Sequence, residues 1–403
     1  MFDRSFLPDR SGLDHAVDLL ASPPDGGGSD TLPESLPETG MGEMAALDSL
    51  APLVLGGARK LGAPEAFAHM DPPTPWIAWA TTLWNASQNQ NLLHPDVAPV
   101  ARDLEARVIA WLAPFFGMDG GHMLPGSTLA NITALWAARE CRGIRRVIGS
   151  EAAHVSVKKA AHLLGLDYLP VASDAAGRLT VSALPDRLDD AALVLTAGTT
   201  NAGAIDDLGA CGAAAWTHVD AAWAGPLRFS ERYADRLDGI EAADSVAVSA
   251  HKWLFQPKES ALILFRETET AHTALSFGGA YLAAPNIGIL GSHGAVAVPL
   301  LATLLAWGRT GLAERIDRTM GFADVLVERL TSHGGVDVFG AQESGVVLWR
   351  PAGASDLQPI FERLPVGLAS RTRIGEVDWV RQVAANPCAD MDRVWAAVAA
   401  ALD

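Results

Sequence analysis

The segment DSVAVSAHKWLFQPKESALILFR, residues 244–266, places a lysine between two short apolar runs. Residues 244–248 and 260–265 have the length and composition of buried β-strands. Lys252 comes directly after the first run, at the edge of the predicted sheet. Because an ammonium group loses hydration at a buried site, its position there calls for a chemical explanation.

Short apolar runs of the same kind recur upstream and alternate with helix-like patterns. Helical spacing of apolar residues marks 99–116, 129–139 and 155–164. The runs are RRVIGS (145–150), LDYLPVA (166–172), ALVLTAG (192–198) and AWTHVDAA (215–222). Apolar strands that alternate with helices indicate a mainly parallel sheet covered on both faces, so we predict a large α/β domain.

A smaller region follows this domain. Residues 294–330 have a helical pattern in which Pro299 is the expected kink, and a closing helix is predicted at 391–402. Between them lie two strand-like segments, 344–351 and 377–386. We therefore predict an N-terminal segment 1–66 with a flexible Gly/Pro-rich stretch 22–42, a large domain 67–311 and a small α+β C-terminal domain 312–403.

Composition narrows the class of protein. The 403 residues are 49% hydrophobic and carry a net charge of -17, which is globular and argues against nucleic acid or an anionic membrane surface as partner. Three separated cysteines, Cys141, Cys211 and Cys388, do not suggest a disulfide framework or a metal site. We see no signal peptide and no membrane-spanning run, so we expect a cytoplasmic protein without a bound metal or a membrane partner.

Polar side chains follow several of the predicted strands, where ligands bind in parallel-sheet enzymes. They are His154, the pair Thr199 and Thr200, Asp220 and Lys252, and Gly126-Ser127-Thr128 precedes a predicted helix. Each alone has an ordinary explanation as a cap, a turn residue or a surface group. Together they offer a helix N-terminus for a phosphate, a carboxylate for a ring nitrogen, an imidazole for an aromatic ring and an amine for an aldehyde. Pyridoxal 5'-phosphate (PLP) needs all four.

The motifs also carry a resemblance to a known family. HVDAAWAG is followed, 32 residues after its aspartate, by the lysine of SAHKW, and together they are similar to the group II PLP-dependent amino-acid decarboxylases. That family includes aromatic-amino-acid, glutamate and 2,4-diaminobutyrate decarboxylases. Further matching blocks are NQNLLHPDVAPVARDLEARVIAWL (89–112), PGSTLANITALWAAR (125–139), AHVSVKKAAHLLGL (153–166) and TAGTTNAGAIDDL (196–208). The resemblance extends over about residues 67–310.

The resemblance implies PLP-dependent transferase fold type I, the aspartate-aminotransferase-like fold, and a homodimer with active sites at the subunit interface. It implies that Lys252 carries the internal aldimine, that Asp220 pairs with the pyridinium nitrogen, and that His154 stacks on the ring. The other implied cofactor contacts are Ser127 and Thr128 at the phosphate, Ala222 on the second ring face, Thr199 at the ring substituents, and Ser249 and His251 nearby. The implied substrate-pocket residues are Gln90 and Asn91, from a segment that in the family reaches into the partner subunit's pocket, and His69 and Asp71, from HMDPPTP (69–75). We add Tyr281 as a further predicted substrate residue.

One departure from the family concerns the reaction itself. Many members have a long mobile loop whose tyrosine protonates the carbon left by loss of CO2, whereas only AAPNIGILG separates Tyr281-Leu282 from Ser292 here. We predict an amino-acid decarboxylase in which His154 or Tyr281 supplies the proton. The alternatives are a PLP enzyme with another outcome, namely transamination, elimination or oxidative deamination, and a non-catalytic member. The sequence does not identify the amino acid that is the substrate.

Overall fold

The computed structural model describes residues 6–28 and 32–403 and divides into two compact units, Met1–Lys60 and Leu61–Asp403. In the first unit, helix α1 (Arg10–Ala21) begins after Asp9, whose carboxylate accepts the N–H of Ser11. His15 on α1 lies 2.6 Å from Asp48 on α2 (Glu43–Ala51), which joins the two helices, and a π-helical turn (Pro52–Gly56) follows. The predicted flexible stretch 22–42 includes 29–31, which lie outside the described residues, and its described remainder contains no helix or strand.

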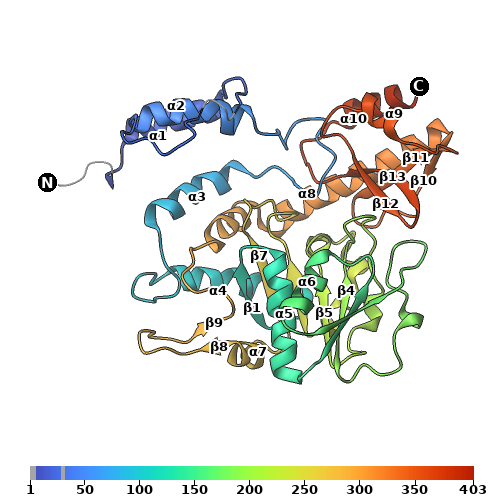
Figure 1. The fold of residues 1–403 in the computed structure, drawn as a ribbon, viewed down its shortest axis with the longest axis horizontal. Coiled ribbons are helices and arrows are strands. Elements are labelled where there is room, and N and C mark those ends of the chain that lie inside the picture. Colours follow the sequence, from blue (N-terminus) through green and yellow to red (C-terminus); the bar gives the residue numbers. More distant parts are fainter. Residues whose placement is uncertain (1–5, 29–31) are drawn as a thin grey trace. The chain divides into compact units, whose positions relative to one another are not determined.

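A seven-stranded sheet forms the centre of the second unit (Figure 1). Its order is β1-β7-β6-β5-β4-β2-β3. Strands β3, β2, β4, β5 and β6 are parallel neighbours, and only β7 runs in the opposite direction. The strands are β1 (Gly120–Leu124), β2 (Arg146–Ser150), β3 (Asp167–Val171), β4 (Ala191–Thr196), β5 (Trp216–Asp220), β6 (Ser245–Val248) and β7 (Ala261–Phe265). The mainly parallel sheet predicted from the sequence is confirmed.

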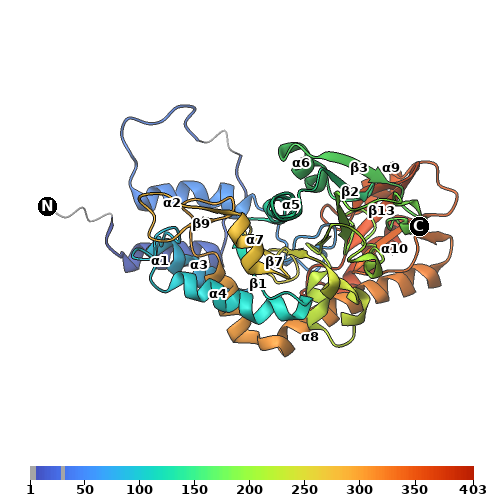
Figure 2. The same ribbon diagram turned by 90° about the horizontal axis from the view of Figure 1, so that it is seen from below.

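Helices cover both faces of this sheet. In Figure 2, α5 (Ser127–Arg142) and α6 (Val155–Leu163) lie on one side of it, and α4 (Ala101–Leu112) and α8 (Ala297–His333) lie on the other. Strand β4 shows why: Ala192 and Val194 pack into the core on one side, and Leu193 and Leu195 into the core on the other. The remaining helices of this region are α3 (Trp76–Gln88) and α7 (Thr268–Ala274), and a small pair of strands consists of β8 (Ser276–Phe277) and β9 (Asn286–Ile287).

The direction of β7 follows from the short connection before it. The 12 residues 249–260 that separate β6 from β7 contain turns and no helix, and a parallel neighbour is usually reached through a crossover helix. The chain therefore turns back, and Lys252 lies in the turn. Strand β1, which the sequence did not predict, pairs with β7 at the edge of the sheet.

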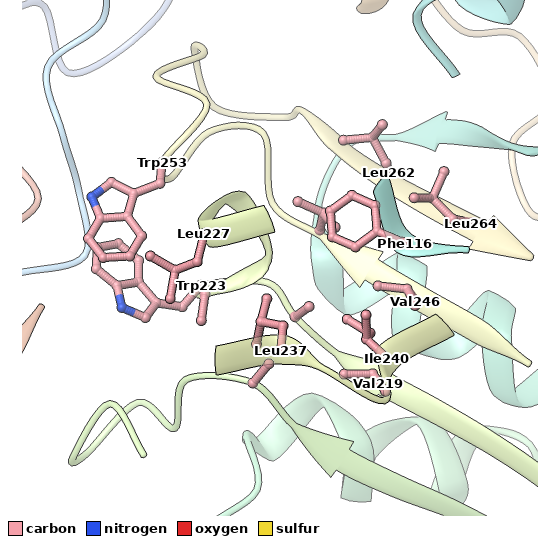
Figure 3. Packing of buried hydrophobic residues seen from close by; sticks show 14 of the residues in the cluster. Phe116, Val219, Trp223, Leu227, Leu237, Ile240, Val246, Trp253, Leu262 and Leu264 are labelled. Carbon is pink, nitrogen blue, oxygen red and sulfur yellow. The ribbon is translucent and has the colours of Figure 1, made fainter. Parts of the chain in front are cut away.

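The larger hydrophobic core lies beside this turn (Figure 3). Trp223 follows β5 and Trp253 follows β6, and their rings stack with centroids 4.1 Å apart. Both side chains are fully buried. The two loops that emerge from adjacent strands are therefore held together by aromatic packing.

The C-terminal part contains a four-stranded antiparallel sheet with the order β10-β11-β13-β12. Helix α8 is interrupted at Gly308 (φ 61°, ψ -175°), so the expected kink at Pro299 is wrong. Pro299 lies in the first turn, where its missing N–H costs little. The remaining elements are β10 (Val336–Val338), β11 (Val346–Pro351), α9 (Gln358–Arg363), β12 (Ser370–Ile374), β13 (Val377–Val383) and α10 (Met391–Leu402).

The last predicted elements are confirmed, since β11, β13 and α10 lie within or match the segments predicted for them. The domain boundaries at 66/67 and 311/312 stay predictions, and α8 runs across the second of them. In the part of the chain that the structure describes, no helix is both long and apolar enough to cross a membrane.

Candidate active site

A cavity of about 230 Å³ lies at the carboxyl ends of β4, β5 and β6. Seven of the residues predicted to contact the cofactor line it: Ser127, Thr128, His154, Asp220, Ala222, His251 and Lys252. Gly126, Thr196, Gly198, Thr200 and Trp223 complete the lining. A larger cavity of about 330 Å³, along β1, contains neither Lys252 nor Asp220. Side-chain chemistry rather than size therefore identifies the candidate site.

Lys252 meets this cavity from the turn between β6 and β7. Burial away from water lowers the pKa of its amine, and the positive charges of Lys258 and Arg381 act in the same direction against the attraction of Asp220 and Asp71. An amine is a nucleophile only when it is unprotonated. The turn thus places at the cavity a lysine whose reactive form is favoured.

Asp220 ends β5 and is buried. Its Oδ1 accepts the N–H of Ala222 at 3.1 Å, and its Oδ2 accepts the side-chain amide of Asn131 at 2.8 Å. These contacts fix the carboxylate at the carboxyl end of β5, where it lines the cavity. A fixed carboxylate at this place can bind a protonated ring nitrogen.

His154 and the first residues of α5 also line this cavity. His154 caps α6, and its Nδ1 lies 2.7 Å from Ser156 Oγ. Ser127 and Thr128 are the first two residues of α5, a helix of 16 residues. The N–H groups of a first helical turn lack partners within the helix and bind anions. The start of α5 therefore has the donors that a phosphate group needs, and the phosphate contacts of Ser127 and Thr128 stay predictions.

His251 stays uncharged beside this lysine. Burial and the nearby Lys258 and Lys252 lower the pKa of His251 to about 4, and its Nδ1 donates to the carbonyl of Ser260 at 3.0 Å. The ring can therefore pack beside a ligand without adding a charge. The sequence predicted a cofactor contact here, and that role stays a prediction.

Two of the predicted cofactor contacts do not reach the cavity. The hydroxyl of Thr199 accepts the N–H of Ala204 at 3.0 Å within its own turn, and Thr200 lines the cavity in its place. Ser249 is fully buried, and its hydroxyl has no hydrogen-bond partner. The hydroxyl of Thr196 is also buried without a partner, and Thr196 does line the cavity. The unpartnered Thr196 hydroxyl fits a ligand that supplies a hydrogen-bonding group here.

The pair of Trp223 and Trp253 restricts the movement of Asp220 and Lys252 relative to each other. Trp223 Nε1 donates to the carbonyl of Ser344 at 2.7 Å, and a side chain at Gly198 (φ +93°) would come within 2.7 Å of the Trp223 ring. Because Trp253 stacks on this ring, the loops that carry Asp220 and Lys252 have little freedom to separate.

Arg381, on β13, is the site residue that the sequence reasoning missed. Its side chain is buried, its Nε donates to the carbonyl of Thr200 at 2.8 Å, and its Nη1 donates to that of Ala68 at 3.2 Å. Burial lowers the pKa of Arg381 to about 10, and the negative charge of Asp71 acts in the opposite direction. The available signal was a single arginine within the apolar run VDWVRQVA. A buried guanidinium that contacts only neutral oxygens is suited to bind a carboxylate.

None of the predicted substrate residues, His69, Asp71, Gln90, Asn91 and Tyr281, lines the cavity of its own chain. Asp71 forms an ion pair with Lys258, and although burial raises the pKa of Asp71, that ammonium and the nearby His69 and His251 lower it overall. Asn91 instead donates to Ser292 Oγ at 3.2 Å.

Comparison with known proteins explains this arrangement. The family model described as the pyridoxal-dependent decarboxylase conserved domain matches residues 28–351. The chain belongs to the pyridoxal-dependent decarboxylase family. Its cofactor is therefore PLP, and its reaction belongs to the class of amino-acid decarboxylation. The side chains around the cavity fit this cofactor.

Several relatives share the sequence or the fold. The L-2,4-diaminobutyrate decarboxylase of Rhizobium meliloti is 33% identical over 352 residues, which cover 79% of this chain and 71% of that protein. The aromatic-L-amino-acid decarboxylase of Bacillus atrophaeus is 28% identical over 262 residues, or 59% of this chain and 55% of that protein. The chain thus spans only about half the length of some relatives.

A solved structure confirms the fold. Oryza sativa TDC, crystallised with PLP and tryptamine, has a TM-score of 0.87 and 22% identity, covering 99% of this chain and 97% of that one. At that identity the likeness establishes the fold alone. The predicted fold type I, with a large sheet domain and a small C-terminal region, is confirmed.

Proposed function

We propose that PLP binds covalently to Lys252 in this cavity and that the enzyme decarboxylates an amino acid whose carboxylate contacts Arg381. The observation that carries the proposal is that a lysine amine of lowered pKa and a buried carboxylate line one cavity. A buried arginine, which has no acidic hydrogen-bond partner among the described residues, donates to the carbonyl of Thr200, and Thr200 lines the same cavity.

Each part of the cofactor has candidate partners in the lining of the cavity. Ser127 and Thr128, at the N-terminus of α5, would bind its phosphate, and Asp220 would hold its ring nitrogen in the protonated form. His154 and Ala222 would contact its ring. When bound, PLP supplies an aldehyde for attachment to the protein and a protonated ring that accepts the electron pair released with CO2.

The chain's own groups bind and orient the substrate. The unprotonated amine of Lys252 would hold the cofactor, and this amine would accept a proton whenever it is released. Arg381 binds the substrate carboxylate, which aligns the bond that breaks. His154 lines the cavity and is in place to deliver a proton to the substrate carbon.

The side chain of the substrate is proposed to carry an amine. The negative charge of Asp71, like that of Asp220, acts on Lys252, and the ion pair of Asp71 with Lys258 is partly exposed and therefore weak. A substrate ammonium can take the place of Lys258. The R. meliloti relative, named for 2,4-diaminobutyrate, acts on an amino acid of this kind. Asp71→Asn should then raise KM for diaminobutyrate more than for an aromatic amino acid.

We also propose that the enzyme is a homodimer. Helix α3 exposes Trp76, Trp79, Leu83 and Trp84 along one side, and Tyr281 is exposed as well. A large exposed aromatic face on a helix is typical of a subunit interface. Trp84→Glu should shift the protein to a monomer in light scattering, whereas Val366→Glu, at another exposed apolar position, should not. A cytoplasmic location stays a prediction from the sequence.

A product assay tests the function directly. The purified enzyme with PLP is given a panel of amino acids, with and without oxygen, and CO2, amine, keto acid, aldehyde and peroxide are measured together. Equal amounts of CO2 and amine support decarboxylation. Keto acid without CO2, or aldehyde with peroxide, would favour the outcomes that the tyrosine-free segment 283–291 suggests.

A further inference from the structure

A chain of hydrogen bonds runs behind the cavity between the two cofactor-facing groups. Trp216 Nε1 donates to Ser245 Oγ at 2.9 Å, and Ser245 Oγ lies 2.9 Å from His218 Nδ1. His218 Nε2 lies 3.0 Å from Asn131 Oδ1. The amide of Asn131 then contacts both Asp220 Oδ2 and Ser156 Oγ at 2.8 Å, and Ser156 Oγ lies 2.7 Å from His154 Nδ1. The chain therefore joins Asp220 and His154 through Asn131.

The chemistry of the end groups determines the direction of each bond near Asn131. A carboxylate only accepts hydrogen bonds, so the group that faces Asp220 must be the NH2 of Asn131, and its oxygen must face His218. His218 Nε2 therefore carries a proton. Its Nδ1 accepts from the hydroxyl of Ser245, which itself accepts from Trp216, since an indole nitrogen only donates.

The same reasoning assigns the proton on His154. The backbone N–H of Ser156 donates to His154 Nδ1 at 3.3 Å. The hydroxyl of Ser156 accepts from Asn131, so its own hydrogen is free to donate to the same Nδ1. His154 Nδ1 is thus an acceptor, and a neutral ring carries its proton on Nε2.

The residues of this hydrogen-bond chain lie in the interior of the protein and not on its surface. Trp216, His218, Ser245, Asn131 and Ser156 are all buried. Buried polar groups cost free energy unless every member of the network is satisfied, and apolar side chains would fill the same space without that condition. These five polar residues meet the condition together and end at two groups that line the cavity.

We propose that Asn131 is a positioning residue that holds Asp220 against the ring nitrogen of the cofactor and keeps the proton of His154 on Nε2, facing the cavity. The proposal rests on the proposed roles of Asp220 and His154. Asn131 touches neither substrate nor cofactor, and it acts through the orientation of these two side chains. The bonds from Trp216 through Ser245 and His218 fix the orientation of the Asn131 amide itself.

Asn131→Asp is the sharpest test because it keeps the shape and the acceptor for His218 but removes both N–H donors. The control is Thr133→Val on the same helix, since Thr133 is fully buried and its hydroxyl has no partner. PLP affinity is measured by titrating each full-length protein from which the cofactor has been removed. We expect Asn131→Asp to bind PLP about tenfold more weakly or worse, because the new carboxyl group faces Asp220 and competes with it for a proton, which weakens the negative charge available to the ring nitrogen. Thr133→Val should bind PLP with the wild-type affinity.

The second measurement does not depend on PLP. Long-range ¹H–¹⁵N NMR of histidine-labelled protein shows which ring nitrogen of each histidine carries the proton. In the wild type we expect His154 and His218 to carry it on Nε2. In Asn131→Asp we expect the His154 proton to be shared between both nitrogens. A wild type with the His154 proton on Nδ1, or a variant with wild-type affinity and an unchanged His154, overturns the proposal.

Ser156→Ala separates the contact of Asn131 with Asp220 from its contact, through Ser156, with His154. It also replaces Asn131→Asp as the test if that variant fails to fold. It removes the hydroxyl that contacts His154 but leaves the bond between Asn131 and Asp220. We expect a change in the His154 proton position with PLP affinity close to that of the wild type. Loss of affinity with an unchanged His154 would contradict the assignment. If the wild type binds no PLP, the proposed function fails, whereas the NMR result still decides the role of Asn131.

Discussion

The buried His218 should contribute to the destabilisation of this protein by acid. Burial outweighs the attraction of Asp220 and lowers the pKa of His218 from its usual 6.5 to about 4. The unfolded chain takes up a proton near pH 6.5, while the folded protein resists protonation until about pH 4, so the free energy of unfolding falls as pH drops through this window. At about 1.4 kcal/mol for each pKa unit, the whole effect is about 3 kcal/mol, of which about 2 kcal/mol is lost between pH 7 and pH 5.

The assay is denaturation by guanidinium chloride at pH 7 and pH 5, with the cofactor removed. His218→Gln keeps a donor for Asn131 but cannot be protonated in this range, so it should lose about 2 kcal/mol less than the wild type between the two pH values. His162→Gln, at an exposed position on α6, is the control and should follow the wild type. If the wild type and His218→Gln lose the same free energy of unfolding between pH 7 and pH 5, His218 does not carry this pH dependence.

Three further predictions concern the site. Trp253→Ala should lower the free energy of unfolding by about 3–5 kcal/mol, because it leaves a large cavity against Trp223. A loss well below this range in a denaturant titration would contradict the prediction. Arg381→Lys should keep PLP bound but raise KM for the amino acid about tenfold or more, and an unchanged KM would exclude Arg381 as the carboxylate partner. Tyr281→Phe should leave the ratio of amine to aldehyde unchanged in the product assay, because Tyr281 is 75% exposed and does not line the cavity of its own chain. A shift toward aldehyde would make Tyr281 the proton donor.

Local sequence patterns were enough to predict where the catalytic groups emerge from the sheet. The apolar runs before Asp220 and Lys252 form adjacent parallel strands, so their carboxyl ends lie side by side. Strand β1 was not predicted because it begins Gly120-Gly121-His122, residues with little preference for strands. The kink at Gly308 rather than Pro299 shows the same limit, since a proline in a first helical turn does not break the helix.

Residues that reach the site from distant parts of the chain could not be predicted from local patterns. Arg381 lies 181 residues from Thr200, whose carbonyl it contacts, and only the packing of β13 brings them together. Asn131 lies 89 residues from Asp220 and looks like an ordinary polar residue in a helix. The role of a buried polar side chain depends on its partners, which are set by the tertiary structure.

Borohydride reduction shows directly whether PLP is attached to Lys252. The enzyme with PLP is reduced with borohydride, digested and mapped by mass spectrometry, alongside Lys252→Ala and, as a control, Lys258→Ala. We expect a phosphopyridoxyl group on Lys252 in the wild type and in Lys258→Ala, and none at any lysine in Lys252→Ala. A label on another lysine, or no label on a wild type that decarboxylates its substrate, would contradict it.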